Sequence, residues 1–364
     1  MTKGGRRFGF KELLLSLFMM VVAWATKEFI APSTPGGNTA GPGDAIQVMF
    51  TTPRYPDSAL YHRGGLDERL IAGIDGAEER VDVGIYNLDL ASVAHALIRA
   101  DQRGVKVRML TDSDHADAAG TSALRGAGIP VVTDEQPSFM HDKFVVIDGH
   151  TVWTGSWNVS DSETYRNNNN IVIVRSEALA RNYTVEFEEM FEDGRFGATS
   201  PDTIPHPDVT VDGVRIETFF ESEGNVRRRI IELINDAETS VHFLAYTFTD
   251  NGIADAIIER HQDGLDVSGV IEGRNIEDPG SDFVAFADAG VRVLKDGNPY
   301  LMHHKVIIVD GAIVIAGSYN FSASAANAND ENVLILHSPD LASAYEQEFE
   351  QISRLAREGV GSGN

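Results

Sequence analysis

Residues 141–149 read His-Asp-Lys-Phe-Val-Val-Ile-Asp-Gly, and residues 303–311 read His-His-Lys-Val-Ile-Ile-Val-Asp-Gly. Both contain the pattern His-x-Lys-x-x-x-x-Asp, and Gly-Ser-x-Asn follows each at the same distance. The offset between the two copies is the same at every fixed position. Two such sets in matching register indicate a duplicated unit rather than chance. The fixed residues are His141, Lys143, Asp148, Gly155, Ser156 and Asn158, and then His303, Lys305, Asp310, Gly317, Ser318 and Asn320.

Each copy predicts a β-hairpin that carries its histidine and lysine near the start of the first strand. The apolar runs 144–147 and 306–309 end at Asp-Gly turns, and a second apolar run follows each turn. Side chains two positions apart on a strand point to the same face, so each histidine lies beside its lysine. Two imidazoles suit a nucleophile and a general acid, while ammonium and amide groups suit phosphate oxygens. The pattern therefore predicts phosphate chemistry.

The duplication extends well beyond the motifs. Buried-strand patterns at 81–86 and 241–246 both end at a tyrosine, and helical patterns flank both of them. Alternating strands and helices are typical of an α/β fold. A cluster of three prolines within 199–208 indicates a linker between the halves. The expected boundaries are 44–197 for the first lobe, 198–212 for the linker, 213–358 for the second lobe and 359–364 for a tail.

The composition limits the possible partners of the chain. A length of 364 residues with 42% hydrophobic residues is enough for two ordinary domains with packed cores. The formal net charge of −25, from 55 acidic and 30 basic residues, disfavours nucleic acid and anionic membranes. This acidity fits either a high-salt habitat or a compositional bias of the source, and the sequence leaves both open. The absence of cysteine excludes disulfides, thiolate metal sites and a cysteine nucleophile.

The first part of the chain, residues 1–43, is expected to direct it out of the cytoplasm. Basic residues precede an apolar run from Leu13 to Ala25, which is typical of a secretory signal peptide. The run is shorter than the roughly 20 residues of a spanning helix, but an uncleaved membrane anchor remains an alternative. A stretch rich in proline and glycine then predicts a flexible tether up to residue 43. Both alternatives place the rest of the chain outside the cytoplasm.

The paired motifs resemble the signature of the phospholipase D superfamily, and the resemblance covers both lobes. Within this superfamily, the chain most resembles two-motif bacterial phospholipases D and cardiolipin-synthase-type proteins. The resemblance implies two similar α/β lobes, each a mixed sheet flanked by helices, that pack pseudo-symmetrically around one shared active site. It also implies a phosphodiesterase that forms a covalent phosphohistidine and needs no metal and no cofactor.

Carried onto this chain, the resemblance gives each motif residue a role. Lys143 and Lys305 are expected to neutralise the non-bridging phosphate oxygens. One histidine attacks phosphorus and the other protonates the leaving alkoxide, with a slight preference for His141 as the nucleophile. Water or another alcohol then resolves the intermediate. The remaining motif residues are expected to assist: Asn158 and Asn320 as hydrogen-bond donors, Ser156 and Ser318 as support for the phosphate site, and Asp148 and Asp310 in a structural role at the hairpin turn or between the lobes.

A carboxylate downstream of the motif often orients the histidine in this superfamily. Glu331 matches that pattern after His303, and the same offset counted from His141 reaches Asn169. A neutral amide supports an imidazolium less well than a carboxylate does, so the sequence predicts that His303 is the more basic histidine. Two nearby acidic residues are candidates to replace the missing carboxylate: Asp161 and Glu163.

These observations predict an enzyme that cleaves or transfers the head-group phosphodiester of phospholipids, with a membrane surface as its partner. The chain is expected to be a monomer. The alternative is a metal-independent endonuclease of the same superfamily, which would need a basic groove that the sequence does not offer. A non-catalytic binding module would be expected to carry a broken motif, and both motifs are intact.

Overall fold

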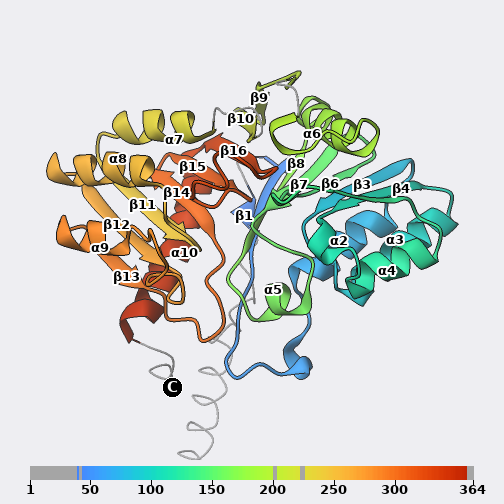
Figure 1. Cartoon of the computed structure of the whole chain (residues 1–364), viewed down its shortest axis with the longest axis horizontal. Helices are drawn as coiled ribbons and strands as arrows, with labels where there is room; N and C mark the ends of the chain where they lie inside the picture. Colours follow the sequence, from blue (N-terminus) through green and yellow to red (C-terminus); the bar gives the residue numbers. More distant parts are fainter. Residues whose placement is uncertain (1–38, 41–42, 200–202, 222–225, 359–364) are drawn as a thin grey trace, which may run out of the picture. The chain divides into compact units, whose positions relative to one another are not determined.

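The computed structural model describes residues 39–40, 43–199, 203–221 and 226–358 (Figure 1). The predicted signal peptide or anchor and the predicted tail lie outside the described residues. Within the described part of the chain, no helix combines the length and the apolar character needed to cross a membrane.

The first lobe is an eight-stranded mixed sheet in the order β1-β2-β8-β7-β6-β3-β4-β5. The pairs β3–β4 and β4–β5 are parallel, and the other pairs are antiparallel. Its strands are β1 (Thr39–Ala40), β2 (Ile46–Phe50), β3 (Arg80–Ile85), β4 (Lys106–Thr111), β5 (Val131–Thr133), β6 (Lys143–Ile147), β7 (Thr151–Gly155) and β8 (Asn170–Arg175).

The second lobe repeats this sheet. Its order is β9-β10-β16-β15-β14-β11-β12-β13, which matches the first sheet strand by strand. Its strands are β9 (Asp208–Val211), β10 (Val214–Phe220), β11 (Ser240–Ala245), β12 (Asp266–Ile271), β13 (Arg292–Lys295), β14 (Lys305–Val309), β15 (Ile313–Gly317) and β16 (Asn332–His337). The predicted duplication of an α/β unit is therefore confirmed.

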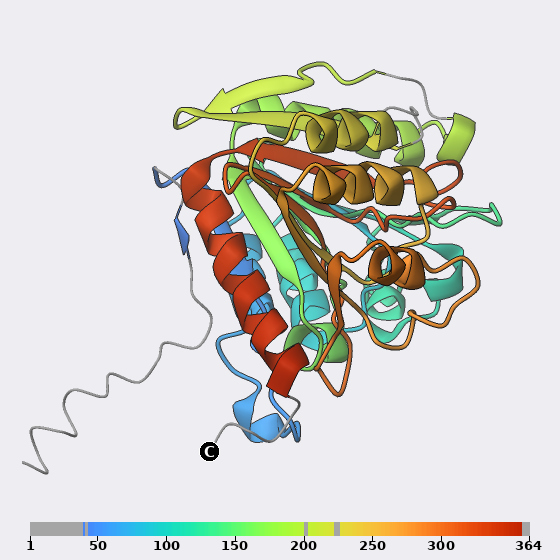
Figure 2. The same cartoon turned by 90° about the vertical axis from the view of Figure 1, so that its left-hand side faces the viewer.

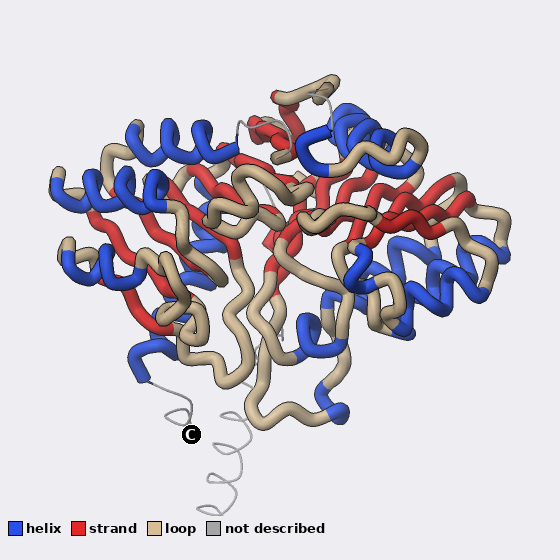
Figure 3. Tube along the Cα trace, viewed as in Figure 1, coloured by secondary structure: helices blue, strands red, loops and turns tan. Residues whose placement is uncertain are grey.

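Helices cover both faces of each sheet (Figures 1 and 3). The first lobe has α2 (Leu66–Asp75), α3 (Ala91–Gln102), α4 (Ala119–Gly126), α5 (Asp161–Tyr165) and α6 (Glu177–Phe191). The second lobe has α7 (Val226–Asn235), α8 (Asn251–Gln262), α9 (Phe283–Asp288) and α10 (Pro339–Glu358). Helix α6 packs on the first sheet on the face opposite α2 to α4, and α10 occupies the matching position on the second sheet (Figure 2).

The inner faces of the two sheets share one hydrophobic core with α6 and α10, so the lobes are not independent bodies. Two symmetry-related hydrogen bonds join them: the Tyr345 hydroxyl donates to Asn170 (3.2 Å), and the amide of Asn332 donates to the Tyr183 hydroxyl (3.4 Å). All four side chains are fully buried. Burial of this much apolar surface is the main force that holds the lobes together, and the expected pseudo-symmetric packing is confirmed.

Two predicted boundaries need correction. Strand β9 begins at Asp208, so residues 208–212 of the predicted linker belong to the second sheet. Its residues alternate between exposed and buried, and a positive-φ Asp-Gly pair at 212–213 turns the chain into β10. The prolines at 205 and 207 mark the end of the linker, and the alternating residues that follow them form the strand. Residues 39–40, assigned to the tether, pair with β2 instead.

Candidate active site

The two motifs meet where the lobes touch, which confirms the expectation of one shared site. His141 precedes β6 and His303 precedes β14, both interior strands of their sheets. Backbone hydrogen bonds cross between the lobes here: the amide of His141 donates to the carbonyl of Asp330 (3.0 Å), and the amide of His303 donates to the carbonyl of Asn168 (2.9 Å). Each histidine is therefore held against the segment that leads into the last core strand of the other lobe.

The side-chain partner of His141 is Glu331. The distance from His141 Nδ1 to Glu331 Oε2 is 2.8 Å, and the carboxylate is buried. Glu331 also accepts hydrogen bonds from the Ser318 hydroxyl (2.6 Å) and the Asn329 amide (3.1 Å). A carboxylate fixed in this way accepts the Nδ1–H, which leaves Nε2 of His141 with its lone pair toward a substrate.

The partner of His303 is an amide backed by a carboxylate. The distance from His303 Nδ1 to Asn169 Oδ1 is 3.0 Å, and Glu163 Oε2 lies 3.3 Å from the same nitrogen. The Asn169 amide donates to Glu163 Oε2 (2.6 Å), and the Ser156 hydroxyl donates to Asn169 Oδ1 (2.8 Å). Glu163, one of the two candidates for a replacement carboxylate, therefore supports His303 and not His141, whereas Asp161 lies elsewhere and pairs with Arg166 (3.2 Å).

The prediction that Glu331 supports His303 is wrong, because the partners are exchanged between the lobes. Glu331 contacts His141, and Asn169 contacts His303. The reason is that the segment before each last core strand pairs with the segment before the motif of the other lobe. Glu331 and Asn169 therefore lie beside the histidine of the opposite lobe. The expectation that His303 is the more basic histidine depends on the same assignment and loses its support, since the direct carboxylate contact at 2.8 Å belongs to His141.

The two motif lysines are buried beside their histidines. Each ammonium donates to the backbone carbonyl of its own motif histidine, Lys143 to His141 (2.7 Å) and Lys305 to His303 (2.8 Å). Burial is the main reason that the pKa of Lys143 falls to about 8. The pKa of Lys305 is lowered by burial and by the neighbouring Lys143. Two confined ammonium groups favour an anion, which a phosphodiester supplies.

A tyrosine from each lobe completes the cation site. The ammonium of Lys143 lies 5.1 Å from the ring centre of Tyr86, and that of Lys305 lies 4.9 Å from the ring centre of Tyr246. The same rings pack edge-on against His141 (5.0 Å) and His303 (4.7 Å). In the sequence, these tyrosines mark only the ends of the two repeated strands. Their matching position in both halves was the signal that could have assigned them to the site.

The surroundings of both histidines favour the neutral imidazole. Burial lowers the pKa of His141 well below its ordinary value, and the nearby Lys143 and Lys305 lower it further. The pKa of His303 is lowered for the same reasons. Burial raises the pKa of Glu331 to about 7, against the opposing effect of Lys143. A phosphate anion placed between the lysines would offset their charge and favour proton uptake by a histidine.

The Gly-Ser-x-Asn residues lie behind and beside the histidines. Ser156 and Ser318 are fully buried and position Asn169 and Glu331, so their hydroxyls act on the histidine partners and not as nucleophiles. Asn158 and Asn320 each have a buried Oδ1 without a hydrogen-bond partner among the described residues. An amide oxygen only accepts hydrogen bonds, so it is the Nδ2–H groups of these two side chains that can donate to phosphate oxygens.

The glycine of each motif is required by close packing of the backbone. A Cβ atom on Gly155 would lie 2.2 Å from the carbonyl oxygen of Asn170, and one on Gly317 would lie 2.0 Å from that of Asn332. Any side chain there would push apart the strands that carry the serine and asparagine. The glycines therefore set the geometry of the site without touching a substrate.

The motif aspartates lie at the far end of each hairpin. Asp148 accepts hydrogen bonds from the backbone amides of residues 78–80 (2.8–3.0 Å), and Asp310 accepts from those of residues 238–240 (2.7–3.1 Å). Both adopt positive φ in their Asp-Gly turns (51° and 55°). This position fits the expected structural role at the turn, and neither aspartate contacts the histidines.

One cluster among the described residues has the spacing of metal ligands, and it lies outside the histidine–lysine set. It consists of Asp57, His62 and Asp161. Arg166 pairs with both carboxylates, at 2.8 Å and 3.2 Å, and so supplies the positive charge that a metal would bring. Next to this cluster is an open pocket of about 520 Å³. It is lined by Asp57, Ser162, Glu163, Arg166, Asn167, Arg274, Tyr300 and Leu301.

The fold and the paired histidine–lysine sets define a phosphodiester-cleaving enzyme of the phospholipase D type. The family model described as "Cardiolipin synthase, PLD-like domain" matches residues 70–191 and 230–353, one match in each lobe. The chain therefore belongs to this family of phospholipase D-like proteins.

Similar proteins include two groups named for lipid cleavage. A "Mitochondrial cardiolipin hydrolase" from Xenopus laevis is 31% identical over 154 residues, which are 42% of this chain and 73% of the relative. A "Phospholipase D" from Rickettsia bellii is 32% identical over 162 residues, which are 44% of this chain and 80% of the relative. The crystal structure of a phosphatidylserine synthase from Haemophilus influenzae matches the fold of both lobes, with a TM-score of 0.61, 14% identity and 89% of each chain covered.

Proposed function

We propose that the protein cleaves the head-group phosphodiester of phospholipids through a covalent intermediate on His141. The observation that carries this proposal is the pairing of His141 with Glu331 at 2.8 Å beside two buried lysines. A neutral imidazole whose Nδ1–H is held by a carboxylate presents Nε2 as a nucleophile. The lysines draw the phosphate into reach and offset its negative charge, which otherwise repels any nucleophile.

In the first step, Nε2 of His141 forms a bond to phosphorus as the bond from phosphorus to the departing oxygen breaks. The negative charge of the bound phosphate favours the protonated form of His303. This imidazolium donates its proton to the departing alkoxide. Asn169 and Glu163 hold its ring in place through Nδ1. Lys143, Lys305 and the two motif asparagines stabilise the charge that gathers on the oxygens in the transition state.

In the second step, neutral His303 takes a proton from the acceptor, whose oxygen attacks the phosphohistidine and releases His141. With water as the acceptor the product is a phosphatidic acid, and with an alcohol it is a new phosphodiester. Hydrolysis or transfer then depends on the acceptor that is present.

A phospholipid is the favoured substrate for two reasons. The relatives described above are named for lipid cleavage. The net charge of −25 also opposes the long-range attraction that a nuclease needs for a polyanion. We further propose that one chain suffices, since both halves of the site come from it, and that it works outside the cytoplasm at a membrane surface, exported or anchored by its N-terminal segment.

The test is head-group release from phosphatidylcholine and phosphatidylglycerol vesicles in EDTA, beside degradation of single- and double-stranded DNA and RNA. His141→Ala and His303→Ala should each abolish lipid cleavage, whereas His95→Ala, at an exposed position on α3, should not. Nucleic-acid cleavage with inert lipid would overturn the substrate but keep the mechanism. Activity that survives both site variants, or that EDTA removes, would overturn the mechanism.

A further inference from the structure

The loop that joins β2 to α2, residues 51–65, has no counterpart of similar length in the second lobe. The equivalent connection between β10 and α7 is much shorter, because it consists only of residues 221–225. The loop also lies outside both segments that match the family model, which begin at residues 70 and 230. The extra length of this connection is therefore specific to the first lobe.

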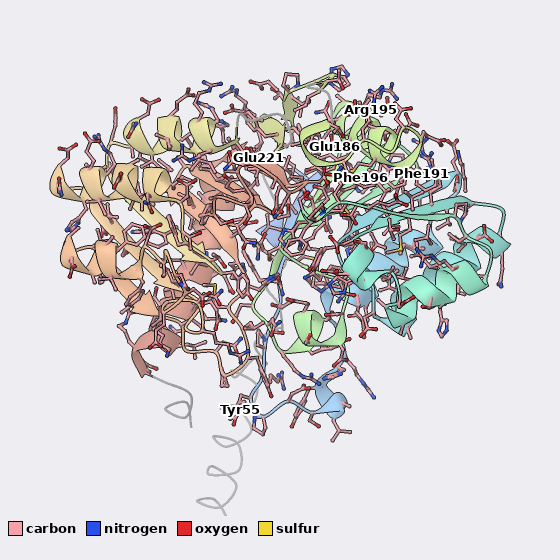
Figure 4. All side chains as sticks on the ribbon, in the orientation of Figure 1. Tyr55, Glu186, Phe191, Arg195, Phe196 and Glu221 are labelled. Atoms are coloured by element: carbon pink, nitrogen blue, oxygen red, sulfur yellow. The ribbon has the colours of Figure 1, made fainter. Side chains whose placement is uncertain are left out.

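This loop exposes an unusual amount of apolar surface. Leu60 is 81% exposed, Tyr55 is 60% exposed and Tyr61 is 55% exposed. These three are half of the six large hydrophobic side chains that are exposed among the described residues. Figure 4 shows Tyr55 at the lower end of the molecule, on the loop that extends below both sheets in the view of Figure 1. Large apolar side chains exposed together on one short loop are typical of an interaction surface.

The charges of the loop are opposite to those of the chain as a whole. Arg54 and Arg63 are both exposed, and Arg54 lies over the ring of Tyr61 at 4.8 Å. The only acidic residue of the loop, Asp57, is held by Arg166 at 2.8 Å. In a protein of net charge −25, an apolar tip flanked by arginines suits one environment in particular, the boundary between lipid head groups and acyl chains.

The base of the loop is tied to the open pocket next to His303. The backbone amide of Asp57 donates to the hydroxyl of Tyr300 (2.9 Å), and the ring of Tyr55 lies 5.7 Å from that of Tyr300. Asp57 and Tyr300 line this pocket together with Glu163, whose carboxylate is 3.3 Å from His303. The base of the loop therefore forms part of the wall of this pocket.

We propose that the loop 51–65 inserts Leu60, Tyr55 and Tyr61 into the lipid interface and brings the pocket beside His303 against the membrane. The proposal rests on the proposed lipid substrate and adds the element by which the enzyme reaches it. Arg54 and Arg63 contact anionic head groups, and the apolar side chains provide the attraction that overcomes the repulsion between an acidic protein and an anionic membrane.

Vesicle binding tests this proposal without turnover. In a His141→Ala background, which prevents cleavage, co-sedimentation with phosphatidylglycerol vesicles is measured for the parent and for Leu60→Ser combined with Tyr61→Ser. Binding should weaken by at least about tenfold, because two exposed side chains lose their apolar transfer energy. Val284→Ser is the matched control, since Val284 is 60% exposed on α9 and lies outside the loop; its binding should stay within about twofold.

The contribution of the two loop arginines to vesicle binding can be tested separately. Arg54→Gln with Arg63→Gln should weaken binding to phosphatidylglycerol vesicles by about fivefold per charge at low salt, and leave binding to phosphatidylcholine vesicles unchanged. Equal binding by the parent and the Leu60/Tyr61 variant would overturn the docking proposal. A loop that instead joins two copies of the chain would show as a dimer that the same variant dissociates, and this would overturn it as well.

Activity measurements separate this proposal from the proposed function. In the active enzyme, the Leu60/Tyr61 variant should lose at least about tenfold of its rate on vesicles, while its rate on a short-chain lipid dissolved below its micelle concentration changes less than about twofold. An equal loss on both substrates would contradict docking. If the parent cleaves no lipid at all, the proposed function fails, and vesicle binding still decides whether the loop docks.

Discussion

His141 in the first lobe and Glu331 in the second are joined by a buried hydrogen bond of 2.8 Å. His303 has no equivalent, because its nearest acceptor is the amide oxygen of Asn169 at 3.0 Å and the carboxylate of Glu163 stands behind it at 3.3 Å. The two histidines are therefore chemically different although the sequence around them is repeated. A direct carboxylate partner fits a nucleophile that must become positively charged as it attacks.

This difference predicts unequal losses when the carboxylates are neutralised. Glu331→Gln should lower kcat/KM on a lipid substrate by roughly 100-fold or more, because the charge that stabilises the attacking histidine is lost. Glu163→Gln should lower it by only about tenfold, since Asn169 still holds His303. Steady-state kinetics of the two variants decide the matter, and a larger loss from Glu163→Gln would assign the nucleophile to His303.

The covalent intermediate should be found on His141. In His303→Ala the general acid is missing, so a substrate with a good leaving group, such as a p-nitrophenyl phosphodiester, is needed for the first step. The second step lacks its base, and the phosphoenzyme should accumulate. Mass spectrometry of peptides from a rapid quench should place the added phosphoryl group on His141. The converse variant, His141→Ala, should accumulate none.

The pH dependence of kcat/KM should be bell-shaped with its maximum between about 7 and about 8. Below the raised pKa of Glu331, about 7, this carboxyl is protonated and no longer stabilises the imidazolium. Above the lowered pKa of Lys143, about 8, the ammonium loses the charge that binds the phosphate. Glu331→Gln should remove the acidic limb and keep the alkaline limb. A profile that stays flat from pH 6 to pH 9 would be inconsistent with both assignments.

Asp142, between the motif histidine and lysine, should make the fold less stable at high pH. Both of its carboxylate oxygens are buried without a hydrogen-bond partner among the described residues. Burial and the nearby Glu331 raise its pKa from 3.8 to about 8. A raised pKa means that the folded state binds the proton more tightly, so its contribution to stability is complete below about pH 4 and is lost as the pH rises through about 8.

Asp142→Asn replaces the protonated carboxyl by a neutral amide of the same shape. The melting temperature of this variant should exceed that of the parent at pH 9 by at least about 2 °C, and the gain should be clearly smaller at pH 5, where most of the ionisation penalty is still absent. Calorimetry in matched buffers measures both. If the gain were equally large at pH 5, the effect would come from packing and not from ionisation.

Gly317→Ala tests the backbone contact beneath the second motif. Its Cβ would lie 2.0 Å from the carbonyl oxygen of Asn332, so β15 and β16 must separate. The free energy of unfolding should fall by about 1–3 kcal/mol, as in other overpacked positions, and activity should fall with it because Ser318 moves away from Glu331. Gly311→Ala is a useful comparison, since no atom lies near its Cβ and its cost should come only from its positive φ of 57°.

Most of the architecture is predictable from the sequence because the same pattern of strands, helices and turns occurs in both halves of the chain. The repeated apolar strands and Asp-Gly turns specify local structure, and the structure contains the predicted hairpins β6–β7 and β14–β15. The exchange of Glu331 and Asn169 between the lobes was not predictable in this way. The offset along the chain is the same whether a residue contacts the histidine of its own lobe or that of the other lobe. Only the packing of the two lobes decides which of the two contacts forms.

The exchange of partners has a consequence for how such a chain can evolve. Two identical halves that assembled around the same crossing would give both histidines the same partner, so every substitution at that position would change both at once. Joining the halves in one chain removes this constraint, because position 331 can keep a carboxylate while position 169 becomes an amide. Fusion thus allows the attacking group and the proton donor to be optimised separately, which a symmetric assembly of identical parts cannot do.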